Sequence, residues 1–177
     1  MKQNKRSFTL VEILMVTGII CLIAALILVA YNGVYQSWST GNTAAAMKAA
    51  HLALDKYMLE NGSYPKQETA DNLENVAGAD TRLSRQLLQD CAPYSNKKSS
   101  GKVEIFDDFG KKAAIKYVFP VSNSSSFALI SAGKDGSYYT EDDIIYLPGG
   151  TTSIKPGFYT GKTTSSGGLS DYEPIAQ

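Results

Sequence analysis

One stretch near the N-terminus decides how this chain folds: Lys5-Arg6-Ser7-Phe8-Thr9-Leu10-Val11-Glu12. It leads into an apolar run from Ile13 to Tyr31, and no charged residue follows until after Met47. At 1.5 Å per residue, the run forms about 28 Å of helix, which nearly matches a hydrocarbon core of about 30 Å. The stretch therefore predicts one membrane-spanning helix with a single carboxylate, Glu12, at its edge.

The charges before the apolar run predict its orientation. Lys2, Lys5 and Arg6 all precede Phe8, and the positive-inside rule places such residues in the cytoplasm and the rest of the chain outside. A secretory signal peptide shares the basic start, but its apolar core is typically only about 7 to 15 residues and a small-residue cleavage site follows it. The longer run, with a carboxylate at its start, favours a retained anchor.

Composition and length narrow the class of protein. The chain has 177 residues, with 17 basic and 17 acidic side chains, so it has no overall basic field that would attract nucleic acid. This length supports about one domain beyond the anchor. Cys21 lies inside the apolar run and Cys91 lies far beyond it, so no disulfide framework is expected.

Glu12 requires a physical explanation, because a carboxylate at the centre of a spanning helix costs about 2.5 to 3.5 kcal/mol. One interpretation is that Glu12 lies at the cytoplasmic interface and reaches water. The other is that cleavage before Phe8 creates a cationic amino terminus, which the Glu12 of a neighbouring subunit neutralises.

The stretch from Lys5 to Glu12, with the apolar run after it, resembles the processing and assembly signal of type IV pilins and of the pseudopilins of type II secretion. The resemblance implies that a prepilin peptidase cleaves between Ser7 and Phe8 and methylates the new amine of Phe8. It also implies that Glu12 guides subunits into a helical filament. The chain departs from the family in having Ser7 where Gly is usual, and Val29 where relatives usually have Pro.

The helix is expected to continue beyond the membrane, from Thr43 to Asn61. Its apolar residues recur at helical spacing and predict one face that packs on a sheet: Met47, Ala50, Leu54 and Tyr57 with Met58. Gly62 is a natural C-cap, and Pro65 prevents the helix from resuming. The segment from Asn61 to Pro65 resembles the Asn-Gly-x-Tyr-Pro turn that ends this helix in major pseudopilins.

Short elements are expected after this turn. The spacing of apolar residues predicts helices at 70–77 and 80–90, and a polar basic run at 95–102 is interpreted as a solvated loop. Strands are predicted at 103–106, 113–119, 126–130 and 144–147, and their short connections imply an antiparallel sheet. The turn from Asp107 to Gly110 resembles the Asp-x-Trp-Gly turn of major pseudopilins, with Phe109 expected to dock on the long helix.

The segment from Ser131 to Ile144 contains four carboxylates, those of Asp135, Glu141, Asp142 and Asp143. Such groups repel one another unless water or a cation separates them. Calcium suits the loop because it accepts six to eight oxygen ligands in flexible geometry. The offsets do not match an EF-hand, and a soluble strand connection with an Asp-Gly turn is the alternative interpretation.

The loop also resembles the Ser-Leu-Gly-x-Asp-Gly segment that binds structural calcium in major pseudopilins. Carried over position by position, the resemblance implies side-chain ligands from Asp135, Asp142 and Asp143. It further implies backbone carbonyl ligands from Ala132 and Thr140.

No catalytic constellation is apparent. His51 is the only histidine, and no nucleophile motif accompanies it, so a structural role is expected. The residues from 151 to 177 are rich in Thr, Ser and Gly, and this C-terminal tail is expected to wrap the domain loosely or to fray.

Together these features predict an α+β protein with a type IV pilin-like fold. We expect a leader at residues 1–7, a transmembrane helix at 8–31, a periplasmic domain with a calcium loop at 32–150 and a tail at 151–177. The resemblance implies a non-enzymatic, single-pass inner-membrane subunit that forms a homopolymeric pseudopilus. Its expected partners are other pseudopilins, the prepilin peptidase, the inner-membrane assembly platform and the lipid bilayer. A type IV pilin or minor pilin, or an anchored periplasmic enzyme, are the alternatives.

Overall fold

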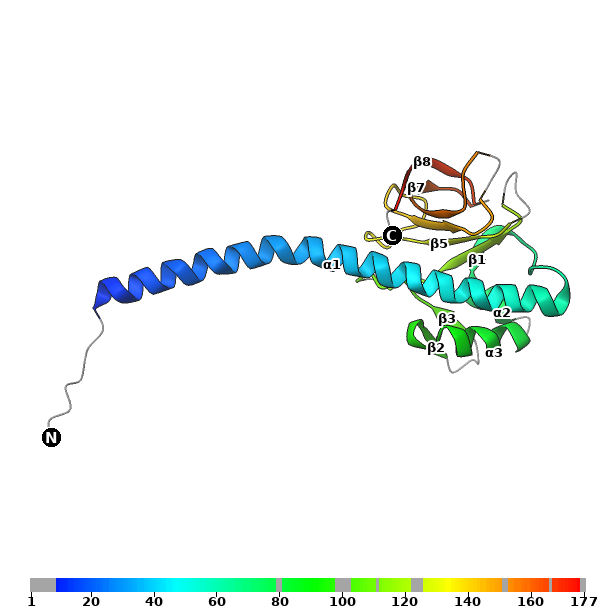
Figure 1. Cartoon of the computed structure of the whole chain (residues 1–177), viewed down its shortest axis with the longest axis horizontal. Coiled ribbons are helices and arrows are strands. Elements are labelled where there is room, and N and C mark those ends of the chain that lie inside the picture. The colour runs from blue at the N-terminus through cyan, green and yellow to red at the C-terminus, as the bar shows by residue number, and fades with distance from the viewer. Residues whose placement is uncertain are drawn as a thin grey trace, which may run out of the picture. The chain divides into compact units, whose positions relative to one another are not determined.

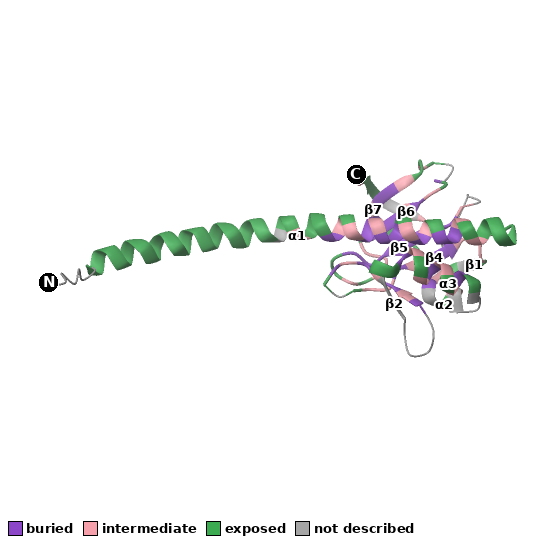
Figure 2. Ribbon diagram, turned by 60° about the horizontal axis from the view of Figure 1, so that its bottom comes forward, coloured by how far each residue is buried: buried purple, intermediate pink, exposed green. Residues whose placement is uncertain are grey.

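A computed structural model describes residues 9–78, 81–97, 103–110, 112–121, 126–150, 153–165 and 167–175. The chain divides into two compact units, Met1–Ser37 and Trp38–Gln177. One helix, α1 (Leu10–Asn61), runs through both of them. In the first unit the described part of α1 is mostly apolar and mostly exposed, and α1 is long and apolar enough to cross a membrane. Figure 2 shows this part of the helix as exposed and the later part as buried along one side.

The second unit is an α+β domain built on an antiparallel sheet (Figure 1). Six strands form this sheet in the order β1-β4-β5-β6-β7-β8, and β2 and β3 form a separate pair. The strands are β1 (Gln67–Asn72), β2 (Ser95–Lys97), β3 (Val103–Ile105), β4 (Lys116–Phe119), β5 (Ala128–Ser131), β6 (Ile144–Leu147), β7 (Gly157–Thr163) and β8 (Leu169–Pro174). The short helices are α2 (Leu73–Gly78), α3 (Thr81–Asp90) and the 3-10 turn η1 (Ala92–Tyr94).

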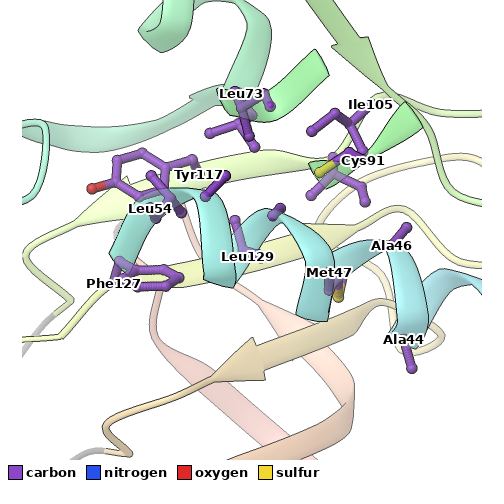
Figure 3. Close-up of a cluster of buried hydrophobic side chains, with 14 of the residues drawn as sticks. Ala44, Ala46, Met47, Leu54, Leu73, Cys91, Ile105, Tyr117, Phe127 and Leu129 are labelled. Atoms are coloured by element: carbon purple, nitrogen blue, oxygen red, sulfur yellow. The ribbon is translucent and has the colours of Figure 1, made fainter. Parts of the chain in front are cut away.

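The core lies between the C-terminal part of α1 and one face of the sheet. Met47, Ala50 and Leu54 are fully buried, as their helical spacing predicts. They belong to one apolar cluster with residues of β4 and β5 such as Tyr117 and Leu129, and Figure 3 shows several of these side chains converging beneath the helix. Their burial anchors α1 to the sheet, since a fully buried Leu or Met side chain contributes about 1.5 to 3 kcal/mol.

The end of α1 follows the predicted chemistry. Gly62 adopts φ 78° and donates its N–H to the carbonyl of Met58 at 2.7 Å. Helices commonly end at a residue with this left-handed backbone, and glycine adopts it readily because it has no Cβ to clash with the backbone. Met58 itself departs from expectation, because its side chain is 38% exposed whereas Tyr57 packs against the core.

The opposite face of the sheet carries a second apolar cluster, so the central strands are buried on both faces. Ile130, Ile145 and Tyr159 lie in register across β5, β6 and β7. They form this cluster together with Val118, Val121, Ala128 and Leu147.

Three predictions about secondary structure were wrong. Residues 70–72 belong to β1 rather than to a helix, because Asp71 and Asn72 pair with Tyr117 and Lys116 of β4. Residues 95–97 form β2 rather than a loop, and the rest of that basic run lies outside the described residues.

The third correction concerns the C-terminal tail, which does not fray over its described strands. Strand β7 pairs with β6 from Ile144↔Thr160 to Leu147↔Gly157, and β8 pairs with β7. Phe158 and Tyr159 are buried on opposite faces of the sheet. Backbone pairing and these two aromatic side chains supply the stability that the composition of the tail does not suggest.

Candidate functional site

The acidic loop connects β5 to β6 and makes three sharp changes of direction. Gly133, Gly136 and Tyr139 adopt φ values of 64°, 67° and 71°. Such left-handed backbone is easy for glycine but costs about 1 to 3 kcal/mol at a tyrosine. The loop therefore holds a strained residue in the middle of its carboxylates.

The carboxylate of Asp142 organises the exposed side of the loop. Its Oδ2 accepts the backbone N–H of Asp135 at 2.9 Å, and its Oδ1 accepts the hydroxyl of Thr140 at 2.8 Å. The carboxylate of Asp135 caps the backbone N–H of Ser137 at 2.6 Å. Asp135, Thr140 and Asp142 thus lie close together, and they line an open pocket with Tyr139, Glu141 and Lys162.

Asp143 lies beneath the loop rather than in the pocket lining. Its side chain is fully buried and accepts the backbone N–H of Tyr139 at 2.8 Å and the hydroxyl of Thr163 from β7. Burial raises the pKa of Asp143, and these hydrogen bonds partly offset that rise. The Thr140 hydroxyl is a third donor, 3.4 Å from Oδ1 of Asp143, so this buried, hydrogen-bonded carboxylate holds the loop to the sheet.

The oxygen donors of the loop are of the kind that calcium prefers. Among the residues that the structure describes, however, no three His, Cys, Asp or Glu side chains converge as a metal-binding group. Ala132, the other expected carbonyl donor, is fully buried.

Gly133 is a position where no other residue fits. A Cβ built there would lie 2.1 Å from the carbonyl oxygen of Asp142 and 2.9 Å from its Oδ2. The start of the loop at Gly133 and its end at Asp142 therefore approach each other backbone to backbone.

A hydrogen-bonded chain connects the loop to α1. The Ser131 hydroxyl accepts the N–H of Gly133 and donates to the carboxylate of Asp107 at 2.8 Å. The next residue, Asp108, receives the side-chain amide of Asn42 at 2.7 Å and donates its N–H to the hydroxyl of Thr43 at 3.1 Å. The turn that begins at Asp107 therefore lies between the acidic loop and the long helix.

The side chains of this turn explain why it is stable. Phe109 is buried in the cluster that contains Ala44 and Met47 of α1, which confirms its expected docking. Asp107 is 2% exposed and accepts the N–H of Ala113 at 2.9 Å. Burial raises the pKa of Asp107 to about 6, although its hydrogen bonds act in the opposite direction.

At the N-terminus, Ser7 and Phe8 lie outside the described residues. Thr9, the first described residue, forms a capping box with Glu12. The carboxylate of Glu12 accepts both the N–H and the hydroxyl of Thr9 at 2.9 Å, and the Thr9 hydroxyl accepts the N–H of Glu12 at 3.3 Å. Glu12 thus satisfies donors that the first turn of a helix leaves free.

The contacts that the structure describes for His51 link elements of the fold. Its Nε2 lies 3.0 Å from Asp55, and its Nδ1 lies 2.8 Å from the hydroxyl of Tyr146 on β6. Asp55 also accepts the hydroxyl of Tyr64 at 2.7 Å. These groups link α1 to the sheet and to the turn that follows the helix.

Comparison with known proteins gives one informative relative. Type II secretion system core protein G from Escherichia coli (strain K12) is 33% identical over 141 residues, which cover 80% of this chain and 90% of the relative. The chain belongs to the family of type II secretion system core protein G, the major pseudopilins. No family model and no solved structure matched the chain.

Two contacts in this pseudopilin were not predicted from its sequence: the capping box of Thr9 with Glu12, and the hydrogen bond from Thr163 to Asp143. The Thr9-Leu10-Val11-Glu12 segment has the Ser/Thr-x-x-Glu pattern of a capping box, so that local signal was present. The support that Thr163 gives to Asp143 had no such signal, because the two residues are separated by the whole of β6 and most of β7.

Proposed function

We propose that this pseudopilin is a structural subunit of a periplasmic pseudopilus that assists the export of folded proteins by a type II secretion system. The observation that carries the proposal is the match to core protein G along 141 residues, together with one exposed apolar helix and one carboxylate at its start. The subunit is non-enzymatic, is anchored in the inner membrane by a single pass, and has its N-terminus in the cytoplasm. Its partners are other copies of itself, other pseudopilins and the assembly platform.

The proposal includes processing of the precursor. A prepilin peptidase cleaves between Ser7 and Phe8 and methylates the amine of Phe8. After cleavage, Thr9 is the second residue of the chain, so the amine lies next to the capping box. A Glu12 that exchanges its contacts with Thr9 for the amine of a neighbouring Phe8 would link insertion of a subunit to its assembly.

The proposal also assigns structural calcium to the acidic loop, with Asp135 and Asp142 as the ligands that line the pocket. The carbonyl of Thr140 and the more deeply placed Asp143 and Ala132 complete the expected set. Bound calcium would neutralise carboxylates that repel one another. It would also stiffen the segment that Ser131 and Asp107 connect to α1.

Mass spectrometry of the N-terminus tests the processing. The chain is purified from membranes of cells that contain a prepilin peptidase, and we expect a mature form that begins at a methylated Phe8. The Phe8→Ala variant and cells without the peptidase serve as controls. A chain that still begins at Met1 in the presence of the peptidase would contradict the proposed processing.

Calcium-dependent melting tests the loop independently of the filament. A soluble fragment that begins at Asn32 is expected to melt at a higher temperature when calcium is added, and Asp142→Ala is expected to remove that shift. Glu141→Ala, an exposed carboxylate in the same loop, is the matched control and should retain most of it. If calcium does not raise the melting temperature of the unmodified fragment, the metal proposal is wrong.

A further inference from the structure

Three aromatic residues recur on consecutive turns of α1 at the end of the apolar run and just beyond it: Tyr31, Tyr35 and Trp38. Their spacings of four and three residues place them along one face of a helix. Tyr31 is 63% exposed and Trp38 is 64% exposed, and the rings of Tyr31 and Tyr35 stack with centroids 6.1 Å apart. We call this set the aromatic stripe.

From the position and chemistry of the stripe, we propose that it anchors the subunit at the outer membrane–water interface before assembly. The proposed partner is the headgroup and glycerol region of the lipid bilayer. Tyrosine and tryptophan are enriched at such interfaces because each ring has an apolar body and a polar edge. The inference rests on the proposed membrane span.

Helical rise places the stripe at the required depth. If Glu12 lies at the inner edge of a hydrocarbon core of about 30 Å, then Tyr31 lies about 28 Å along the helix and Tyr35 about 34 Å. Trp38 lies about 39 Å along it, or about 37 Å from the same plane at the usual helix tilt of about 20°. The headgroup zone extends about 5 to 7 Å beyond the core. Helical side chains point back toward the N-terminus, so each ring lies slightly closer to the core than its own backbone. All three rings therefore fall at or inside the outer limit of the headgroup zone.

Residues around the stripe fit the same boundary. Leu28 and Val29 before it are exposed and purely apolar, as the hydrocarbon core requires. Asn32 and Gly33 follow, and the first charged residue after the stripe is Lys48. The aromatic residues therefore coincide with the change from apolar to polar composition along α1.

Trp38 is the only tryptophan in the chain, so its fluorescence reports this position without labelling. The full chain is reconstituted into vesicles whose lipids carry bromine either near the headgroup end or near the methyl end of the acyl chain. We expect Trp38 emission at shorter wavelength than in water, and stronger quenching by the shallow bromine. The reference is an Ile20→Trp, Trp38→Phe double variant, which places tryptophan near mid-span and should be quenched more strongly by the deep bromine.

The anchoring role is tested by removing the other two rings. Tyr31→Ala with Tyr35→Ala is expected to move Trp38 toward water and to lower its shallow quenching at least twofold. Val29→Ala with Val34→Ala, two exposed apolar residues of the same segment, is the matched control and should leave the quenching nearly unchanged. Equal losses in the two variants would show that apolar content, not aromatic character, positions the helix, and the proposal would be wrong.

The reference variant separates failure of this proposal from failure of the proposed span. If Ile20→Trp is quenched but Trp38 behaves as a hydrated indole, the span is correct and the interfacial anchor is wrong. If neither tryptophan is quenched, the membrane span itself is wrong and the anchor fails with it. If the Trp38 emission responds to protein concentration but not to bromine, its partner is a second copy of the chain, and the lipid proposal is overturned.

Discussion

Gly133→Ala should destabilise the α+β domain by more than the cost of its left-handed backbone alone. Two separate penalties meet at this residue. Its φ of 64° is unfavourable for alanine, and the added Cβ would lie 2.1 Å from the carbonyl oxygen of Asp142. A carbon and a carbonyl oxygen approach no closer than about 3.3 Å even in favourable contacts, so the two strands of the loop must separate by about 1 Å.

The chain offers a matched control for the backbone term. Gly62 has a similar φ of 78°, but a Cβ there meets nothing within 4 Å. Gly62→Ala should therefore cost about 1 to 2 kcal/mol, the penalty for left-handed backbone alone. Gly133→Ala carries the same penalty and also displaces Asp142 from its bonds to Asp135 and Thr140, which adds about 1 kcal/mol for each bond lost.

The measurement is urea denaturation of the fragment that begins at Asn32, with and without calcium. Without calcium, Gly133→Ala should lower the free energy of unfolding by about 3 to 4 kcal/mol, against about 1 to 2 kcal/mol for Gly62→Ala. With calcium, only Gly133→Ala should also lose the added stabilisation. Equal effects of the two variants would refute the reasoning, because the contact between Gly133 and Asp142 would then carry no energetic weight.

Three further predictions concern the core, the buried carboxylate and the helix start. Leu54→Ala should cost about 2 to 5 kcal/mol because its side chain is fully buried, whereas Leu52→Ala, at a site that is 58% exposed, should cost about 0.5 kcal/mol or less by urea denaturation. Folding raises the pKa of Asp107 from 3.8 to about 6, so the folded state favours the protonated carboxyl. Protonation of Asp107 therefore contributes fully to the free energy of unfolding below pH 3.8, and this contribution is lost as the pH rises to 6. The stability of Asp107→Asn relative to the unmodified fragment should therefore increase by up to about 3 kcal/mol between pH 3.8 and pH 7, and a constant difference would contradict the assignment. Thr9→Ala should lower protection of the first-turn amides of α1 in hydrogen exchange by about 1 kcal/mol, the usual value of an N-cap, while amides in the middle of the helix stay unchanged.

The helical part of the fold was predictable because its signals are local. Met47, Ala50 and Leu54 repeat at helical spacing, and Gly62 marks the end of α1, so both its buried face and its limit were confirmed. Strand β1 gave no such signal, since Gln67–Asn72 is polar and becomes a strand only by pairing with β4. The same holds for β7, which is rich in Gly and Thr and depends on the partner strand β6.

The acidic loop shows the same division between local and long-range information. The sequence brings Asp135, Thr140 and Asp142 together because they lie within one short connection. It could not show that Asp143 faces inward, because that depends on Thr163 from a distant strand. Calcium binding stays a prediction for the whole set.

Electron microscopy of membranes from cells that overproduce this chain together with type II secretion components tests the central claim most directly. We predict filaments that an antibody against the α+β domain labels along their length, and we predict that Glu12→Ala abolishes them while the protein still accumulates in the membrane. Membranes that contain the processed chain but no labelled filaments would contradict its assignment as a pseudopilus subunit.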